Sequence, residues 1–262
     1  MLFPTPTHKC PGRRAALALA LVLAVGCAPT FPATCVPGRI VELHVDLPPD
    51  DAARFAREAE AFVSDVSRYL GVPPPKARVY VFGSGWRLRR YLNRECAAFH
   101  ERAGACFEAS DGRLTVALAA ADAGCPETPV LRHELTHAVI AANVARPMPW
   151  LDEGLAQVFE RGCPPVDDPG RRARLTDLAP RIGPRLTRLL RLERHAQLDR
   201  TDYLIAWGFT WFLLHDRADG RRVIRACLGP PALGETPFQR AARGLGAPPD
   251  EFAREFIRSL RP

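Results

Sequence analysis

The chain has 262 residues, of which 47% are hydrophobic and 25% charged, and its formal net charge is +7 at pH 7. These proportions are typical of a folded globular protein and exclude a largely disordered chain. Three of the basic residues lie near the N-terminus, and the arginine pairs elsewhere are scattered among acidic residues. We therefore expect no nucleic-acid partner.

Residues 1–26 are predicted to be a signal peptide. A basic start is followed by an apolar run at residues 15–25, which is too short to span a bilayer. The segment 23–27 ends in Gly26 and Cys27 and resembles a bacterial lipobox, whose cysteine is acylated. The sequence therefore predicts export to the cell envelope with a lipid anchor on Cys27, or secretion if the signal is an ordinary one.

Six cysteines follow Cys27, an even number that agrees with an exported, disulfide-bonded protein. Their pairing is not fixed by the sequence. Cys96 and Cys106 bracket a polar turn and are the first candidate pair, and Cys125 and Cys163 are the second. Because no C-x-x-C motif occurs, we do not expect a metal site built from cysteines.

A linker is predicted at residues 27–39, followed by one domain at 40–262. We divide the domain into an N-terminal lobe at about 40–145 and a helical C-terminal lobe at 146–262. In the N-terminal lobe, alternating apolar residues predict strands and helical periodicity predicts helices. The predicted strands are 40–46, 77–82 and 113–118, and the predicted helices are 48–70, 86–98 and 129–144.

The stretch HELTH at residues 133–137 falls inside the last of these helices. Histidines four residues apart on a helix project from one face, so His133 and His137 can reach one ion. Glu134 faces the open side of that ion, where it can take a proton from a water molecule. Two histidines at the edge of a core would give the same spacing without a metal.

A carboxylate downstream favours the metal. A break at residues 146–149 is followed by a second predicted helix at 152–160, which carries Glu153. Together with the two histidines, Glu153 would give two nitrogens and one oxygen, with a fourth position left for water. Asp152 either orients a ligand histidine or lies exposed at the start of the helix.

The C-terminal lobe is predicted to be helical throughout. Its expected helices are 175–195, 202–216, 221–228, 238–245 and 250–260. Tyr203, Trp207 and Trp211 are spaced four residues apart, which is typical of an aromatic stripe that packs into a core.

The HELTH motif and the stretch WLDEGLA at residues 150–156 together resemble the gluzincin zinc peptidases, and most closely the bacterial peptidase MA-like group. The resemblance covers roughly residues 40–260, although only these two motifs are highly specific. A metzincin is excluded, because Ile140 and Asn143 stand where that family needs glycine and a third histidine. An aspzincin would use Asp152 as the ligand, but the Glu-Gly-x-Ala context matches the group with a glutamate ligand.

The resemblance implies an α+β, zincin-like fold with one Zn²⁺ per chain on His133, His137 and Glu153, and Glu134 as the general base. It also implies that the strand at 113–118 lies at a sheet edge and pairs with an extended peptide, and that the Tyr203 hydroxyl stabilises the oxyanion. We expect a monomeric endopeptidase that acts on a peptide or protein substrate. The rivals are an aminopeptidase, whose amine-binding motif we do not find, and an envelope module that binds zinc without hydrolysis.

Overall fold

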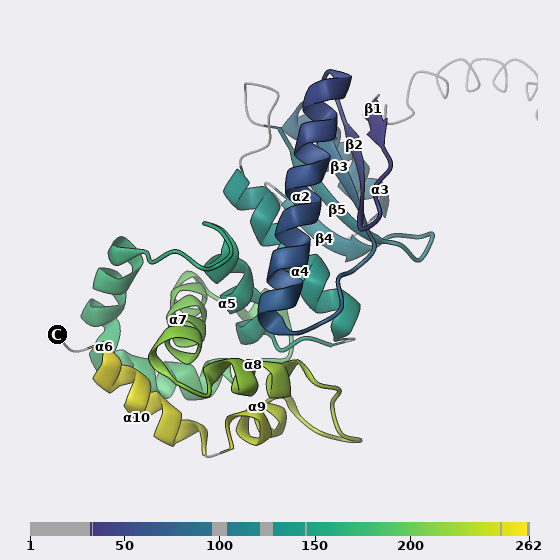
Figure 1. The fold of residues 1–262 in the computed structure, drawn as a ribbon. Helices are drawn as coiled ribbons and strands as arrows, with labels where there is room; N and C mark the ends of the chain where they lie inside the picture. Colours follow the sequence, from purple (N-terminus) through teal and green to yellow (C-terminus); the bar gives the residue numbers. More distant parts are fainter. Residues whose placement is uncertain are drawn as a thin grey trace, which may run out of the picture. The chain divides into compact units, whose positions relative to one another are not determined.

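The computed structural model describes Pro32 and residues 34–95, 104–120, 128–144, 146–246 and 248–260. The N-terminal part of this region holds five strands and three helices, and the remainder is helical (Figure 1). The first group is β1 (Thr34–Val36), β2 (Val41–Val45), α2 (Pro49–Leu70), β3 (Ala77–Phe82), α3 (Gly85–Glu95), β4 (Gly104–Glu108), β5 (Leu114–Ala119) and α4 (Thr128–Asn143). The second group is α5 (Pro149–Phe159), α6 (Pro169–Leu189), the 3₁₀ helix η1 (His195–Gln197), α7 (Arg200–Trp211), the π-helix η2 (Phe212–Asp216), α8 (Gly220–Leu228), α9 (Pro237–Leu245) and α10 (Pro249–Ser259).

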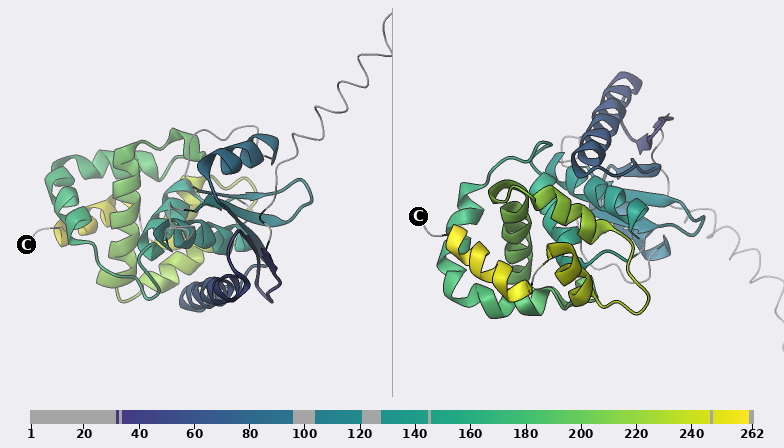
Figure 2. Two further views of the ribbon diagram at one scale, coloured as in Figure 1. Left: turned by 90° about the horizontal axis from the view of Figure 1, so that it is seen from above. Right: turned by 60° about the horizontal axis from the view of Figure 1, so that its bottom comes forward.

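The five strands form one mixed sheet in the order β1-β2-β3-β5-β4. The three central strands are parallel to one another, and β1 and β4 are antiparallel to their neighbours. Helices cover both faces: α2 and α4 pack on one, and α3 packs on the other (Figures 1 and 2). This mixed α/β architecture is consistent with the predicted α+β class.

The alternation along β3 explains why both faces of the sheet need a cover. Val79 and Val81 are buried in the large core beneath α2, whereas Tyr80 and Phe82 point to the opposite side. There they form a small aromatic core with Tyr91 of α3. A strand that is buried on both faces lies inside a sheet, which agrees with the position of β3 between β2 and β5.

One prediction about the sheet is wrong. The strand at 113–118, observed as β5, was expected at the sheet edge, but it lies between β3 and β4. The edge strand on that side of the sheet is β4. Residue patterning did not predict it, because its five residues, GACFE, do not alternate cleanly between polar and apolar. A hairpin through residues 109–113 folds β4 back against β5, and this antiparallel return places it outermost.

Several boundaries also differ from the predictions. The strand β1 lies within residues 27–39, where a linker was expected. Helix α6 begins at Pro169 and not at 175, because the Asp168 side chain caps it by accepting from the Arg171 backbone N–H and Pro169 occupies the first helical position. Pro149, which was expected in a break, likewise occupies the first helical position of α5, although no side chain caps that helix.

No helix among the described residues is both long and apolar enough to cross a bilayer. The predicted signal peptide and the proposed acylation site Cys27 lie outside the described residues.

Candidate metal centre

Helix α4 presents its two histidines on a single free face. Leu135, Ala138 and Val139 are fully buried and fix the helix beneath the sheet. His133 and His137, four residues apart, therefore share the face that turns toward α5. Their side chains are 20% and 14% exposed, so both imidazoles are largely shielded from water but can still be reached.

Helix α5 lies close enough to bring its carboxylates to these histidines. All eleven residues of α5 are buried. Its Gly154 packs against α7 so closely that a Cβ there would lie 2.2 Å from Oγ1 of Thr210 and 2.6 Å from the carbonyl oxygen of Ala206. Only glycine fits at this crossing, and the close approach fixes the rotation of α5 that turns the neighbouring Glu153 toward α4.

Three potential ligand atoms converge between the helices. The Nε2 atoms of His133 and His137 are 3.0 Å apart, and Oε2 of Glu153 lies 3.5 Å from the first and 3.9 Å from the second. A tetrahedral ion bound at the usual zinc–nitrogen distance would hold its donors about 3.3 Å apart. The observed spacing therefore fits a metal ion after small side-chain adjustments.

The burial of Glu153 points independently to a cation. Its side chain is 3% exposed, and its Oε2 atom has no hydrogen-bond partner within the described part of the chain. A buried carboxylate oxygen without a partner is costly in free energy. A cation held by this oxygen and the two imidazoles removes that cost, so the three residues could hold a metal ion.

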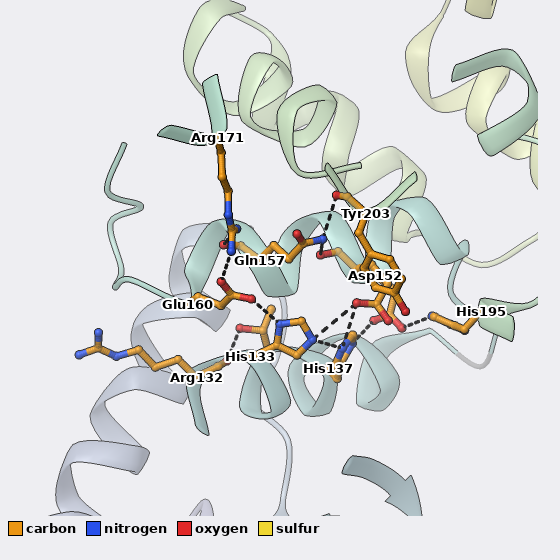
Figure 3. A network of polar contacts seen from close by, with 11 residues as sticks. Arg132, His133, His137, Asp152, Gln157, Glu160, Arg171, His195 and Tyr203 are labelled. Carbon is orange, nitrogen blue, oxygen red and sulfur yellow. Dashed lines mark hydrogen bonds and ion pairs between the residues drawn. The ribbon is translucent and has the colours of Figure 1, made fainter. Parts of the chain in front are cut away.

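Asp152 contacts the Nδ1 side of the His137 imidazole, away from the Nε2 atoms (Figure 3). Its Oδ1 atom lies 2.8 Å from Nδ1 of His137, and its Oδ2 atom lies 2.7 Å from Nε2 of His195. Asp152 is therefore buried between two histidines and is not exposed at a helix start. Asp152 contacts Nδ1, on the far side of the His137 ring from Nε2. The carboxylate that faces the Nε2 atoms of both histidines is that of Glu153, which disfavours the aspzincin alternative.

Glu160 supports the other imidazole in the same way (Figure 3). Its Oε1 atom lies 2.9 Å from Nδ1 of His133, and its Oε2 atom accepts a hydrogen bond from Nη2 of Arg171 at 2.7 Å. Each imidazole thus has a carboxylate at Nδ1, which fixes the ring and leaves Nε2 for an ion. Such carboxylate–histidine pairs are the usual support of metal-binding histidines.

In the metal-free site, the surrounding carboxylates stabilise a positive charge on the histidines. Burial alone would lower the pKa of His133, but the nearby carboxylates of Glu153, Glu160 and Glu134 outweigh burial and raise this pKa to about 10. His133 therefore carries a proton at neutral pH when no metal is bound. A divalent ion can replace that proton and neutralise the same carboxylates.

The other histidine follows the same pattern. Burial would lower the pKa of His137, but the charge and the hydrogen bond of Asp152 outweigh burial and raise it. Burial would raise the pKa of Asp152, yet His137 and His195 hold this pKa far below its usual range. The carboxylates of the centre therefore stay ionised at neutral pH, as metal binding requires.

Glu134 lies against the edge strand. A Cβ on Gly104, the first residue of β4, would come within 2.8 Å of Cγ and 3.0 Å of Oε1 of Glu134. Cys106 is two residues further along, and its thiol pKa is raised by burial and by the nearby charges of Glu134 and Asp152. The start of β4 therefore runs beside the acidic side chain that is next to the first histidine.

Tyr203 lies at the end of the first turn of α7, close to α5. Its carbonyl oxygen accepts a hydrogen bond from Nε2 of Gln157, and Figure 3 shows its side chain directed toward the end of the site that holds Asp152. Trp207 and Trp211 are buried and stack on each other with ring centroids 6.0 Å apart, as an aromatic core stripe would. Tyr203 differs from them because it is only half-buried.

A cavity of about 890 Å³ lies elsewhere, between the C-terminal end of α4 and one end of the sheet. Its walls include Arg39, Arg78 and Ala142, but none of the three ligand residues. The chemistry of the metal centre therefore does not extend to this cavity, despite its size.

The structure does not show either predicted disulfide. Cys106 and Cys163 form no disulfide with another described residue, and their expected partners Cys96 and Cys125 lie outside the described residues. Both pairings stay predictions. Mass spectrometry of the exported protein without reductant tests the first, for which we expect Cys96 linked to Cys106.

Three polar residues of this centre were not predicted from the sequence. Glu160 follows Glu153 by seven residues, two helical turns, and this spacing on one helix face is a signal that could have revealed it. Arg171 and His195 reach the centre only through the packing of α6 and η1. His195 has no metal-ligand spacing to His133 and His137, so the sequence offers no signal for its place in the centre.

Comparison with known proteins identified no relative of this chain. No protein-family model matches the chain, and no curated protein is significantly similar to it.

Proposed function

We propose that this protein is a zinc-dependent peptidase with a zincin-like fold of the gluzincin type. The observation that carries the proposal is the buried Oε2 atom of Glu153, which faces the Nε2 atoms of His133 and His137 and has no hydrogen-bond partner in the described part of the chain. Two imidazoles and one carboxylate form the ligand set of many catalytic zinc sites, in which the fourth position stays open.

Zinc is the ion that this set of donors suits best. Calcium and magnesium prefer sites built from oxygen ligands alone, whereas imidazole nitrogen favours zinc and its transition-metal neighbours. The carboxylates of Asp152 and Glu160 increase the basicity of the imidazoles and so strengthen their bonds to such an ion.

A bound zinc ion supplies a Lewis acid that polarises the scissile carbonyl and makes a water molecule acidic. Glu134, whose side chain lies beside the start of β4, would accept the proton of that water and return it to the leaving amine. Asp152 and Glu160 hold the two imidazoles in place throughout. The Tyr203 hydroxyl donates a hydrogen bond to the oxyanion as charge develops on it.

The edge strand suggests how a substrate binds. In the described part of the chain, β4 pairs with β5 on one side and with no strand on the other. An extended peptide can add to such an edge through backbone hydrogen bonds, which recognise shape more than side chains. Because β4 begins against Glu134, a peptide on this edge would pass the catalytic base. This arrangement favours an endopeptidase.

The direct test replaces Glu134 by glutamine. The Glu134→Gln protein should keep its zinc, because Glu134 is not a ligand, and should lose at least about 99% of its turnover of a peptide library. Glu58→Gln, the same change at an exposed position on α2, is the matched control and should be fully active. Equal turnover by wild type and metal-loaded Glu134→Gln would contradict the proposed role of Glu134 as the general base.

The same library, offered with free and with blocked N-termini, distinguishes the endopeptidase from an aminopeptidase. An endopeptidase cleaves both forms, whereas an aminopeptidase cleaves only the free one. A zinc-loaded wild-type protein that cleaves neither form would instead be a binding module.

We also propose that the enzyme acts in the cell envelope, held by a lipid on Cys27. The proposal depends on the apolar run at residues 15–25 and the Gly26-Cys27 pair that follows it. Cys27→Ala should move the protein from the membrane to the soluble fraction. A wild-type protein found in the soluble fraction would show that the signal is an ordinary one.

A further inference from the structure

A second group of metal-binding side chains lies on the outer face of the β1–β2 pair. Cys35 of β1 stands directly opposite His44 of β2 in the antiparallel register. Glu42 precedes His44 by two residues, so both point to the same face, while the residues between and beside them in β2 are fully buried. Strand pairing therefore gathers a thiol, an imidazole and a carboxylate on one face.

The donor atoms of these three residues are close together. One atom from each lies within 4.8 Å of the other two, and Nε2 of His44 is 2.7 Å from Oε1 of Glu42. Among the described residues, the metal centre between α4 and α5 is the one other group of three that meets this criterion. The two groups share no residue.

Neighbouring side chains already fix two of the three donors. The His44 ring stacks on Tyr80 of β3, with centroids 4.6 Å apart and planes inclined by 29°. Arg78 and Arg113 approach the Glu42 carboxylate at 3.5 Å and 3.6 Å. Cys35 is exposed, so its thiol can rotate toward the other donors without disturbing the core. The group is thus half-organised before any ion binds.

The chemistry of the donors selects the class of ion. A thiolate excludes calcium and magnesium as preferred partners, and the combination of sulfur, nitrogen and oxygen suits zinc. Zinc accepts tetrahedral sites of this kind, with water at the fourth position. The sequence does not reveal this group, because residues 35, 42 and 44 have none of the usual zinc-ligand spacings. They come together only through the pairing of β1 with β2.

We propose that Cys35, Glu42 and His44 form a second zinc site, which joins β1 to β2. The site binds zinc more weakly than the centre between α4 and α5, for two reasons. Its ligands are more exposed to water, and two arginines share the charge of Glu42. Zinc bound there ties β1, the first strand of the sheet in chain order, to β2.

Cobalt(II) distinguishes the two sites, because a bond from thiolate to cobalt gives a strong charge-transfer absorption in the near ultraviolet. The first centre has no sulfur ligand, so this absorption reports the second site alone. The experiment titrates the reduced full-length protein with cobalt(II), in wild type and in four variants. These are Cys35→Ser, His44→Gln, Glu153→Ala and, as a matched thiol control, Cys163→Ser.

We expect the absorption of one thiolate per chain in wild type, in Glu153→Ala and in Cys163→Ser, and we expect zinc to abolish it. Cys35→Ser should lose it, and His44→Gln should bind cobalt at this site at least about tenfold more weakly. The melting temperature without metal verifies that each variant is folded. No absorption in wild type, or an unchanged absorption in folded Cys35→Ser, would overturn the proposal. Neither result tests the proposed peptidase activity, because the absorption needs a thiolate and the centre between α4 and α5 has none among its three proposed ligands.

Discussion

The two groups of metal-binding residues use similar side chains in opposite surroundings. Between α4 and α5, two imidazoles and a carboxylate are largely shielded from water, and each imidazole is held by a further carboxylate. On the β1–β2 face, an imidazole and a carboxylate bond directly to each other, and the thiol is exposed. The buried group leaves a carboxylate oxygen of Glu153 without a partner, whereas the exposed group satisfies Glu42 with His44 and two arginines.

The comparison teaches that burial, more than residue type, determines how strongly a site requires an ion. Desolvated charges without a partner must be compensated, and water compensates the charges of an exposed group. Metal should therefore be an integral part of the α4–α5 centre. At the β1–β2 face it is an addition that the fold tolerates but does not need.

The largest effect should come from removing the carboxylate ligand of the buried centre. Glu153→Ala should weaken zinc binding there by more than about 100-fold, because two imidazoles alone hold the ion poorly. Glu42→Ala, the equivalent change at the exposed group, should leave this affinity unchanged. Competition with a chromophoric chelator measures both. If the two variants lose zinc equally, the two sites are not independent.

The edge strand offers a second test, which acts on the proposed base Glu134 and leaves the proposed ligands intact. Gly104→Ala introduces a Cβ within 3.0 Å of the Glu134 side chain, which must then move. A displaced catalytic group costs about 100-fold in turnover, while zinc content should stay constant. Gly85→Ala is the matched control, since its Cβ would have nothing within 4 Å. Full activity of Gly104→Ala would show that Glu134 is not held by β4.

Tyr203→Phe tests the oxyanion role with the least structural disturbance. The ring stays while its hydrogen-bond donor is lost, so kcat should fall by about 100-fold with unchanged zinc content and melting temperature. Tyr80→Phe, on the ring that stacks against His44, is the control and should leave kcat unchanged. Turnover close to wild type in Tyr203→Phe would return this residue to the aromatic core stripe.

The smallest effect concerns the stability of the metal-free protein. The pKa of His133 is raised from 6.5 to about 10 in the folded chain. Its protonated form therefore stabilises the fold fully below pH 6.5, and this contribution is lost as the pH rises through about 10. With chelator present, the melting temperature should fall by about 5 °C or more between pH 6.5 and 10. His133→Ala should show a clearly smaller fall, and an equal fall would contradict the assignment.

The sequence predicted the parts of the centre that depend on spacing within one helix. His133 and His137 share one face because both lie on α4, where four residues make about one turn. Glu153 lies on α5 and was predicted from the second motif, whereas the packing of α5 against α4 brings it to the histidines. His195 could not be predicted, since it meets Asp152 across 43 residues through the packing of η1. The same limit applies to Cys35 and His44, which become neighbours only through strand pairing.

In the sheet too, local features were predicted from the sequence and long-range features were not. The alternation of β2 predicted this strand almost to the residue, because a strand with one buried face has a two-residue period. The bounds of β3, which is buried on both faces, were also predicted correctly. The edge position of the strand at 113–118 was predicted wrongly, because strand pairing is a long-range property. The short strand β4 has weak local preference and is fixed by its hairpin with β5, so the edge beside Glu134 was assigned to the wrong strand.

X-ray absorption spectroscopy of the protein loaded with one equivalent of zinc tests the central claim most directly. Our account predicts that the ion enters the buried centre first and has only nitrogen and oxygen ligands at about 2.0–2.1 Å, with the scattering pattern of two imidazoles. The spectrum should be the same in Cys35→Ser. A sulfur ligand at about 2.3 Å in the wild type would contradict the account, because the first equivalent of zinc would then prefer a thiolate over His133, His137 and Glu153.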